Sequence, residues 1–190
     1  MKALRILLCV GLTFMLCGCM GYKEIDKGYL VTAVGISNKN DNAGIFIEAI
    51  SASDTAKGEN ERIVLASNGN DIYQAYSNLK TTLVKPLYFE QLGAVIIEGY
   101  LDDGLNFIKQ IPNINYGIYI TKTDDVKLLF ESYSAKGLLG YDIISLIKTQ
   151  QKQNAKKLST QYFEIQNTKN LPTINILSGK LIIEFAGCFD

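Results

Sequence analysis

Blocks of apolar and polar residues near the start of the chain predict three strands. Residues 30–36 and 45–50 are compact apolar runs with β-branched side chains, which are typical of buried strands. The polar cluster at 38–42 separates them, so we expect the two to pair as a hairpin. A third strand is expected at 63–66, after a charged, glycine-containing loop at 54–61.

Helical spacing begins after the third strand. Asn70 or Asp71 offers an N-cap, and Pro86 prevents the helix from running further. Its apolar stripe consists of Ile72, Tyr76, Leu79 and Leu83. The run at 94–97 is strongly apolar and too short for a helix, so it predicts a central strand.

The middle of the chain predicts three more helices and one strand. A stripe formed by Leu101, Leu105 and Ile108 ends at Pro112, and alternation at 116–121 favours a strand. Thr123 is the expected cap of the next helix, which has the stripe Val126, Leu129, Phe130 and Tyr133. Gly137 and Gly140 indicate a break. The last helix is expected at 142–154, with an inward face of Ile143, Ile144 and Ile147.

The tail has short strand candidates at 161–165, 173–177 and 180–185, and Ser178 and Gly179 form a hairpin turn between the last two. The order of elements predicts an α+β (mixed α/β) fold. We expect a mostly antiparallel mixed sheet packed with about four helices.

The first residues predict export. Lys2 and Arg5 precede an apolar stretch at 6–16, as in a secretory signal. The following residues Leu16, Cys17, Gly18 and Cys19 resemble a bacterial lipobox. This predicts a signal peptide at 1–18, cleavage before Cys19, a diacylglycerol on its thiol and a tether at 19–29. A spanning anchor is the weaker alternative because it needs about twenty apolar residues, and a secretory signal without lipid also stays open.

The composition of the chain excludes several classes of function. Removal of 1–18 leaves 17 basic and 19 acidic residues, a net charge of −2, so we expect no binding to nucleic acid. The chain has no His, which excludes a His-based triad or base and a histidine-ligated zinc. Only Cys188 would keep a free thiol in the mature chain, so no internal disulfide forms. We predict no catalytic residue, no metal site and no cofactor beyond the lipid.

Two acidic pairs allow two interpretations. Asp102 with Asp103, and Asp124 with Asp125, could act as paired carboxylates for a metal or for acid–base chemistry. Each pair also stands where a helix is expected to begin, and acidic residues are favourable in a first helical turn. We favour the helix-entry interpretation for both.

Three segments together resemble a known family. They are Gly18-Cys19 with Glu24, Ile25 and Asp26 before the run LVTAVGI at 30–36; LYFEQLGAVIIEG at 87–99; and LPTI at 171–174 with Gly187, Cys188 and Phe189. In this order they resemble the Ger(x)C spore germination proteins, the lipoprotein C subunits of nutrient germinant receptors. Tyr88 stands where His is common in the family, and Ser37 stands where Asp is usual.

The resemblance implies a membrane-anchored, non-catalytic subunit that takes part in nutrient-triggered germination. It implies N-palmitoyl and S-diacylglycerol groups on Cys19, and a location on the outer, extracytoplasmic surface of the spore inner membrane. The implied partners are the A- and B-type membrane subunits and the lipid. Candidate partner contacts are Glu24, Asp26, Tyr88 and Phe89, although a solvated spacer and core packing are the plainer interpretations of these residues.

The resemblance also implies a domain organisation. We expect a mixed α/β domain at 30–170 and the start of a second, truncated domain at 171–190. The alternative function is an extracytoplasmic solute-binding lipoprotein, for which a pocket with convergent polar groups would count. A secreted hydrolase that uses carboxylates is the least favoured, since no nucleophile motif occurs.

Overall fold

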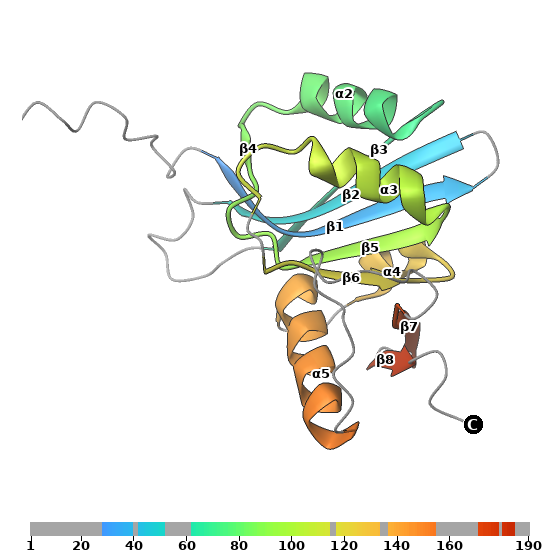
Figure 1. Ribbon diagram of the computed structural model, residues 1–190. Coiled ribbons are helices and arrows are strands. Elements are labelled where there is room, and N and C mark those ends of the chain that lie inside the picture. The colour runs from blue at the N-terminus through green and yellow to red at the C-terminus, as the bar shows by residue number, and fades with distance from the viewer. Residues whose placement is uncertain are drawn as a thin grey trace, which may run out of the picture.

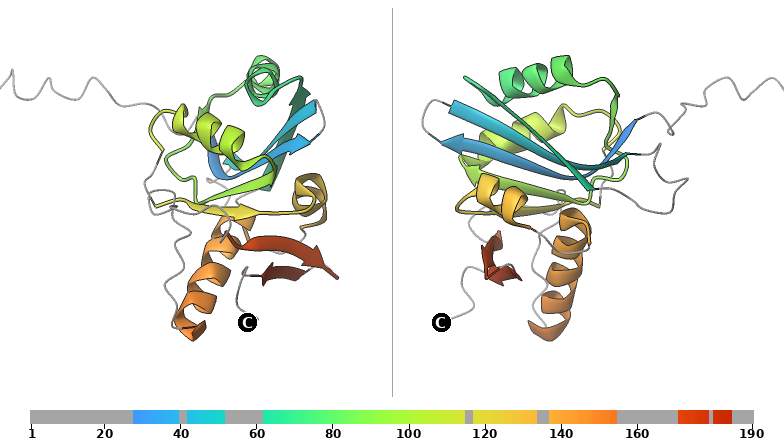
Figure 2. Two further views of the ribbon diagram at one scale, coloured as in Figure 1. Left: turned by 45° about the vertical axis from the view of Figure 1, so that its right-hand side comes forward. Right: turned by 180° about the vertical axis from the view of Figure 1, so that it is seen from behind.

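The computed structural model describes residues 28–39, 42–51, 62–114, 117–133, 137–154, 171–178 and 180–184. Within them, one eight-stranded mixed sheet carries helices on both faces (Figure 1). Further views show α2 and α3 on one side of the sheet and α4 and α5 on the other (Figure 2). The α+β class and the four helices are therefore confirmed. The predicted signal, lipobox and tether up to residue 27 lie outside the described residues, as does the loop at 54–61.

The first three strands form an antiparallel meander. They are β1 (Tyr29–Lys39), β2 (Asn42–Ser51) and β3 (Arg62–Gly69). The predicted hairpin is confirmed, because β1 pairs with β2 along its length and β2 pairs with β3. The ladder between β1 and β2 shifts register between Val31 and Ala33.

Parallel strands extend the sheet from β1. β5 (Ala94–Gly99) pairs with β1, and β6 (Tyr119–Lys122) pairs with β5. Residues 94–97 are all buried, as expected of a central strand that is covered on both faces. A two-residue strand that the sequence did not predict, β4 (Leu87–Tyr88), pairs with the beginning of β1. The sheet order is β3-β2-β1-β5-β6-β7-β8.

The structure corrects the expected strand at 116–121. β6 begins three residues later, and its Tyr119, Ile120 and Thr121 are all buried. Both faces of this strand are covered by helices, so the alternation does not separate a buried face from an exposed one. In the tail, β7 (Thr173–Leu177) and β8 (Lys180–Glu184) form the predicted hairpin.

β7 joins the same sheet through one parallel pair, between Lys122 and Thr173. Leu171 and Ile174 are buried in the core of the described domain. The expected boundary at 170–171 stays a prediction, and the expected strand at 161–165 lies outside the described residues.

A side-chain cap begins α2 (Ile72–Thr82), whereas α3 (Leu101–Lys109) begins without one. The Asp71 side chain accepts a hydrogen bond from the Gln74 amide at 2.7 Å, which confirms the aspartate as the cap of α2. Asp102 and Asp103 lie in the first turn of α3, as the helix-entry interpretation predicted.

Two predictions about α4 (Val126–Ser132) and α5 (Leu139–Asn154) are corrected. Asp125, not Thr123, caps α4, because its carboxylate accepts from the Leu128 amide at 2.8 Å. Gly140 lies inside the first turn of α5 rather than at a break. A Cβ on Gly140 would stand 2.2 Å from the Thr32 carbonyl oxygen, so a glycine lets the helix approach β1 this closely.

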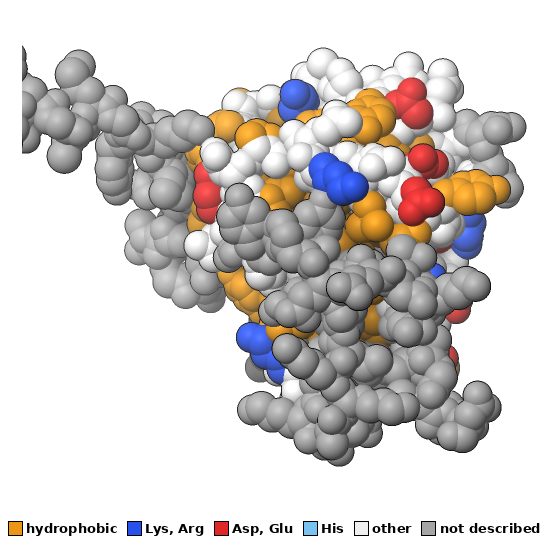
Figure 3. All heavy atoms as spheres, in the orientation of Figure 1, with side chains coloured by type: hydrophobic (Ala, Val, Ile, Leu, Met, Phe, Trp, Pro, Cys, Tyr) orange, Lys and Arg blue, Asp and Glu red, His pale blue; other side chains and the backbone are white. Residues whose placement is uncertain are grey.

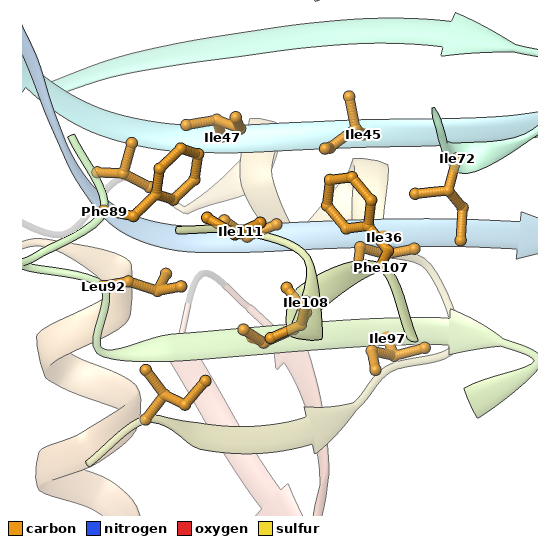
Figure 4. Packing of buried hydrophobic residues seen from close by; sticks show 14 of the residues in the cluster. Ile36, Ile45, Ile47, Ile72, Phe89, Leu92, Ile97, Phe107, Ile108 and Ile111 are labelled. Carbon is orange, nitrogen blue, oxygen red and sulfur yellow. The ribbon is translucent and has the colours of Figure 1, made fainter. Parts of the chain in front are cut away.

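Two apolar cores lie on opposite faces of the sheet. Under α2 and α3, side chains from β1, β2 and β5 meet Ile72, Phe107 and Ile108 (Figure 4). Under α4 and α5, the predicted inward residues Leu129, Phe130 and Ile143 are buried with Phe46 and Ile96. Each core lies between the sheet and one helix pair, so the sheet is the common wall of both.

Candidate functional site

A buried carboxylate lies at the centre of the α4–α5 face. Glu48 of β2 is fully buried, and both its oxygens accept hydrogen bonds. Oε1 accepts from Arg62 Nε at 2.6 Å and from the Leu139 amide at 2.9 Å. Oε2 accepts from Thr32 Oγ1 at 2.7 Å and from the Gly140 amide at 3.1 Å. The negative charge thus stands at the positive N-terminal end of α5 and holds it against β1 and β2.

Arg62 extends this network to α4. Its Nη1 donates to the Tyr133 carbonyl at 3.1 Å, and its Nη2 donates to the Phe130 carbonyl at 2.9 Å. The guanidinium also stands 5.2 Å from the centre of the Tyr133 ring. One ion pair therefore joins β1, β2, β3 and the ends of two helices. Every nitrogen of the guanidinium has a protein acceptor, which is the arrangement of a structural pair.

Tyr133 carries the network to a hollow of about 410 Å³ between α5 and β8. Its hydroxyl donates to the Asp142 carboxylate. Burial raises the pKa of Tyr133 well above its usual value, and the bond to Asp142 raises it further. The phenol therefore keeps its proton at neutral pH. The hollow is lined by Tyr133, Asp142, Ser145, Leu146, Thr149, Gln150, Lys180 and Leu181, so its wall combines hydrogen-bonding groups with two leucines.

A second polar cluster lies where the parallel strands end. Glu98 of β5 accepts from the Val126 amide at 3.1 Å and pairs with Lys39 Nζ at 2.5 Å. The hydrogen bond to Glu98 raises the pKa of Lys39. Asp103 accepts from Asn38 at 2.7 Å, and Asp124 accepts from Asn175 at 2.8 Å. These bonds join β1, β5 and β7 to the ends of α3 and α4.

The aspartates of this cluster are engaged in hydrogen bonds that hold elements of the fold together. Within the described part of the chain, no three Asp, Glu, Cys or His side chains gather as metal ligands would. Asp125 is used as a helix cap, and Asp102 lies in the first turn of α3. Asp102 and Asp103 are helix-entry residues, as the favoured interpretation predicted, whereas Asp125 is the cap of α4 and Asp124 precedes that cap.

The candidate contacts Tyr88 and Phe89 lie at the opposite end of the sheet. Phe89 is only 5% exposed and packs edge-on against Tyr76, so its plainer interpretation as a core residue is correct. Tyr88 is half-buried and covers Gly28, because a Cβ at Gly28 would stand 2.1 Å from the tyrosine ring. Tyr88 also lines a hollow of about 290 Å³ together with Glu90. Contact of Tyr88 with a partner stays a prediction.

The other residues that the sequence singled out lie outside the described residues. These are Cys19, Leu16, Cys17, Gly18, Glu24, Asp26 and Cys188. Sequence reasoning missed the Glu48–Arg62 pair. A signal was present, because a glutamate interrupts the apolar run at 45–50 and an arginine directly precedes the run at 63–66.

With this geometry in hand, the chain can be compared with known proteins. A family model described as the spore germination protein N-terminal domain matches residues 21–178. The chain belongs to this family. The match confirms the resemblance that we found in the three sequence segments. No curated protein and no solved structure matches the chain.

Family membership supports a role in spore germination, and it suggests association with other germination proteins and with the spore membrane. The family is not a known enzyme family. None of the helices in the described ranges has the length and apolar character that a membrane span requires.

Proposed function

We propose that the chain is a non-catalytic lipoprotein subunit of a spore nutrient germinant receptor. In this proposal, acyl groups on Cys19 hold it on the outer surface of the spore inner membrane. The observation that carries the proposal is the family match at 21–178, which begins directly after a lipobox that ends at Cys19. A short tether at 19–29 then joins the lipid to the folded domain.

The role of the domain is to dock with the A- and B-type membrane subunits. The charged groups of Glu48, Arg62 and Glu98 are engaged in bonds that hold elements together, so we assign them to the fold of the docking domain. The diacylglycerol and the N-linked fatty acid together keep a protein on a bilayer far longer than one acyl chain would, since each buried CH₂ contributes about 0.8 kcal/mol. Anchoring in the same membrane as the partners raises the effective concentration for docking.

Substitution of the lipidated cysteine tests the anchor. In Cys19→Ala spores we expect an intact fold, weaker retention in the membrane fraction and slower germination with nutrients. The matched control is Cys188→Ala, which removes the other mature thiol and leaves retention and germination unchanged. Wild-type retention and germination in Cys19→Ala spores would contradict the proposed anchor.

Docking is tested by purification of the chain from detergent-solubilised spore membranes. We expect both membrane subunits to co-purify with it, at similar yield before and after a high-salt wash. A chain that is abundant in the membrane fraction and yet purifies without either subunit would contradict docking while leaving the anchor in place.

The hollow beside Tyr133 favours a second candidate, the binding of a small polar solute. Its hydroxyl, carboxylate and ammonium groups converge on a volume that would admit an amino acid or a sugar. Titration calorimetry with amino acids and sugars tests this candidate. Saturable heat that disappears in Lys180→Ala, and not in Lys122→Ala at the far end of β6, would establish solute binding here.

A further inference from the structure

The two ends of the sheet differ in charge. Near the beginnings of β1 and β6 lie three lysines and one glutamate, namely Lys80, Lys85, Lys148 and Glu90. Near the ends of β1, β5 and β6 lie five exposed aspartates and three lysines, namely Asp71, Asp102, Asp103, Asp124, Asp125, Lys39, Lys122 and Lys127. Figure 3 shows acidic side chains gathered on the right of the view, where β1 and β5 end in Figure 1.

The difference holds when the connecting segments are counted from the sequence. The segment at 52–61 leaves β2 opposite the beginning of β1 and adds one lysine and three acids, so that end becomes neutral. The pair at 40–41, between the other ends of β1 and β2, adds one aspartate. The strand-end side therefore carries the excess of negative charge.

The tether enters the domain at the neutral end. Gly28 precedes β1 and lies under the Tyr88 ring, and the Tyr29 amide donates to the Pro86 carbonyl at 2.9 Å. Nine residue steps separate Cys19 from Gly28, and a fully extended chain spans at most about 3.6 Å per step, or about 32 Å. β1, with its 11 residues, spans about 33 Å. A domain with its acidic end on the bilayer would need this tether stretched to its full length.

An exposed apolar side chain projects from the tether end. Val84 is 96% exposed, in the turn between α2 and β4, and it adjoins Lys85 and the last turn of α2 with Lys80. An apolar tip flanked by lysines suits the boundary of a bilayer that contains anionic lipids. The acidic end would be repelled by the same surface.

We propose that the domain stands on the bilayer with the beginnings of its strands towards the lipid, Val84 at the surface and the aspartate-rich end pointing away. The partner of this end is the lipid surface itself. This orientation rests on the proposed lipid anchor at Cys19, and it leaves the ends of β1, β5 and β6 accessible to other proteins above the membrane.

The test measures the distance of three exposed positions from the lipid headgroups. In a Cys188→Ser background, Val84→Cys, Leu128→Cys and Tyr100→Cys each introduce one free thiol for a fluorescent donor. Leu128 lies on the first turns of α4, and Tyr100 follows the end of β5 and is 71% exposed. The full chain is produced with its own signal in a bacterial host, extracted and reconstituted into vesicles of phosphatidylglycerol and phosphatidylcholine with an acceptor on the headgroups.

Two checks come first. Mass spectrometry tells whether the chain is acylated, and co-sedimentation tells whether it binds the vesicles. For an acylated chain that sediments, we expect energy transfer to be severalfold higher from position 84 than from position 100. Equal or higher transfer from position 100 overturns the orientation and leaves the anchor standing. A domain lying on its α4–α5 face would give the highest transfer from position 128, which also overturns it. An unacylated chain that stays in solution overturns the anchor and the orientation together.

Discussion

The face of the sheet under α2 and α3 is closed by apolar side chains, whereas the face under α4 and α5 also buries a carboxylate and most of a guanidinium. Apolar packing is strong but not directional. The hydrogen bonds of the Glu48–Arg62 pair are directional. They join the pair to specific backbone carbonyls at the end of α4 and specific amides at the start of α5. The comparison indicates that α2 and α3 are held by burial, whereas α4 and α5 are held in position by hydrogen bonds as well.

The two faces also differ in whether they offer a hollow beside the polar network. The α2–α3 face is filled by apolar side chains, among which Ile36, Ile97 and Ile108 are fully buried (Figure 4). The α4–α5 face opens beside Tyr133 into the hollow that ends at β8. α5 and the end of α4 at Tyr133 contact both the network and the hollow, so a solute or partner that binds there would act on these two helices.

Removal of the Glu48 carboxylate is expected to have the largest effect on stability, and it tests whether hydrogen bonds hold the α4–α5 face. Glu48→Ala leaves Arg62 without its partner and two amides at the start of α5 without an acceptor. We expect a loss of about 3–5 kcal/mol in the free energy of unfolding, measured with urea. Glu48→Gln, which keeps the shape, should still destabilise because its NH₂ group faces donors. A loss below about 1 kcal/mol for Glu48→Ala would show that the network does not hold this face.

On the face under α2 and α3, the loss of stability should depend on how much buried side-chain volume a substitution removes. Ile108→Ala is expected to lower the free energy of unfolding by about 2–5 kcal/mol, and Ile108→Val by about 0.5–1.5 kcal/mol. Urea unfolding of both variants measures this gradation. Equal losses in the free energy of unfolding for Ile108→Val and Ile108→Ala would contradict this account. The loss would then not depend on the side-chain volume that is removed.

The cap of α4 offers a smaller test. Asp125→Ala removes the acceptor for the Leu128 amide and should lower the free energy of unfolding by about 1 kcal/mol. The matched control is Glu131→Ala on the same helix, whose exposed carboxylate stands 4.0 Å from Lys127 Nζ, and for it we expect less than about 0.5 kcal/mol. The cap assignment is wrong if the two thermal midpoints fall by the same amount.

Tyr133→Phe is expected to have the smallest effect on the free energy of unfolding at neutral pH, and its effect should be seen at high pH. The pKa of Tyr133 is raised in the folded chain, so the unfolded chain loses this proton first and stability falls as pH rises above about 10. In Tyr133→Phe this decline should be shallower. It should not vanish, since burial also raises the pKa of Tyr76. Denaturation from pH 8 to 11 measures the slope, and an unchanged slope in Tyr133→Phe contradicts a buried, protonated phenol.

Local patterns predicted the elements whose causes are local. The apolar run at 94–97 became the central strand β5, and the stripe beginning at Ile72 became α2 with Asp71 as its cap. The exceptions depend on distant neighbours. β4 has only two residues and exists because the beginning of β1 lies beside it. Gly140 predicts a break but lies in the first turn of α5, because Thr32 and Glu48 contact the helix there.

The candidate site divides in the same way. A lipobox is a contiguous pattern, so lipidation of Cys19 can be predicted from the sequence, and it stays a prediction. The hollow beside Tyr133 could not, because its wall combines α5 with β8, which lie far apart in the chain. Glu48 and Leu139 are likewise 91 residues apart, and no periodicity relates them. Contacts at such separations follow only from the packing of the whole domain.

Mass spectrometry of the native protein from spore membranes tests the central claim, that a lipid anchor at Cys19 carries this domain. We predict a mature chain that begins at Cys19 and carries a diacylglycerol on its thiol and a fatty acid on its amino group. A chain that retains the residues before Cys19, or a Cys19 without fatty acid, would contradict the account.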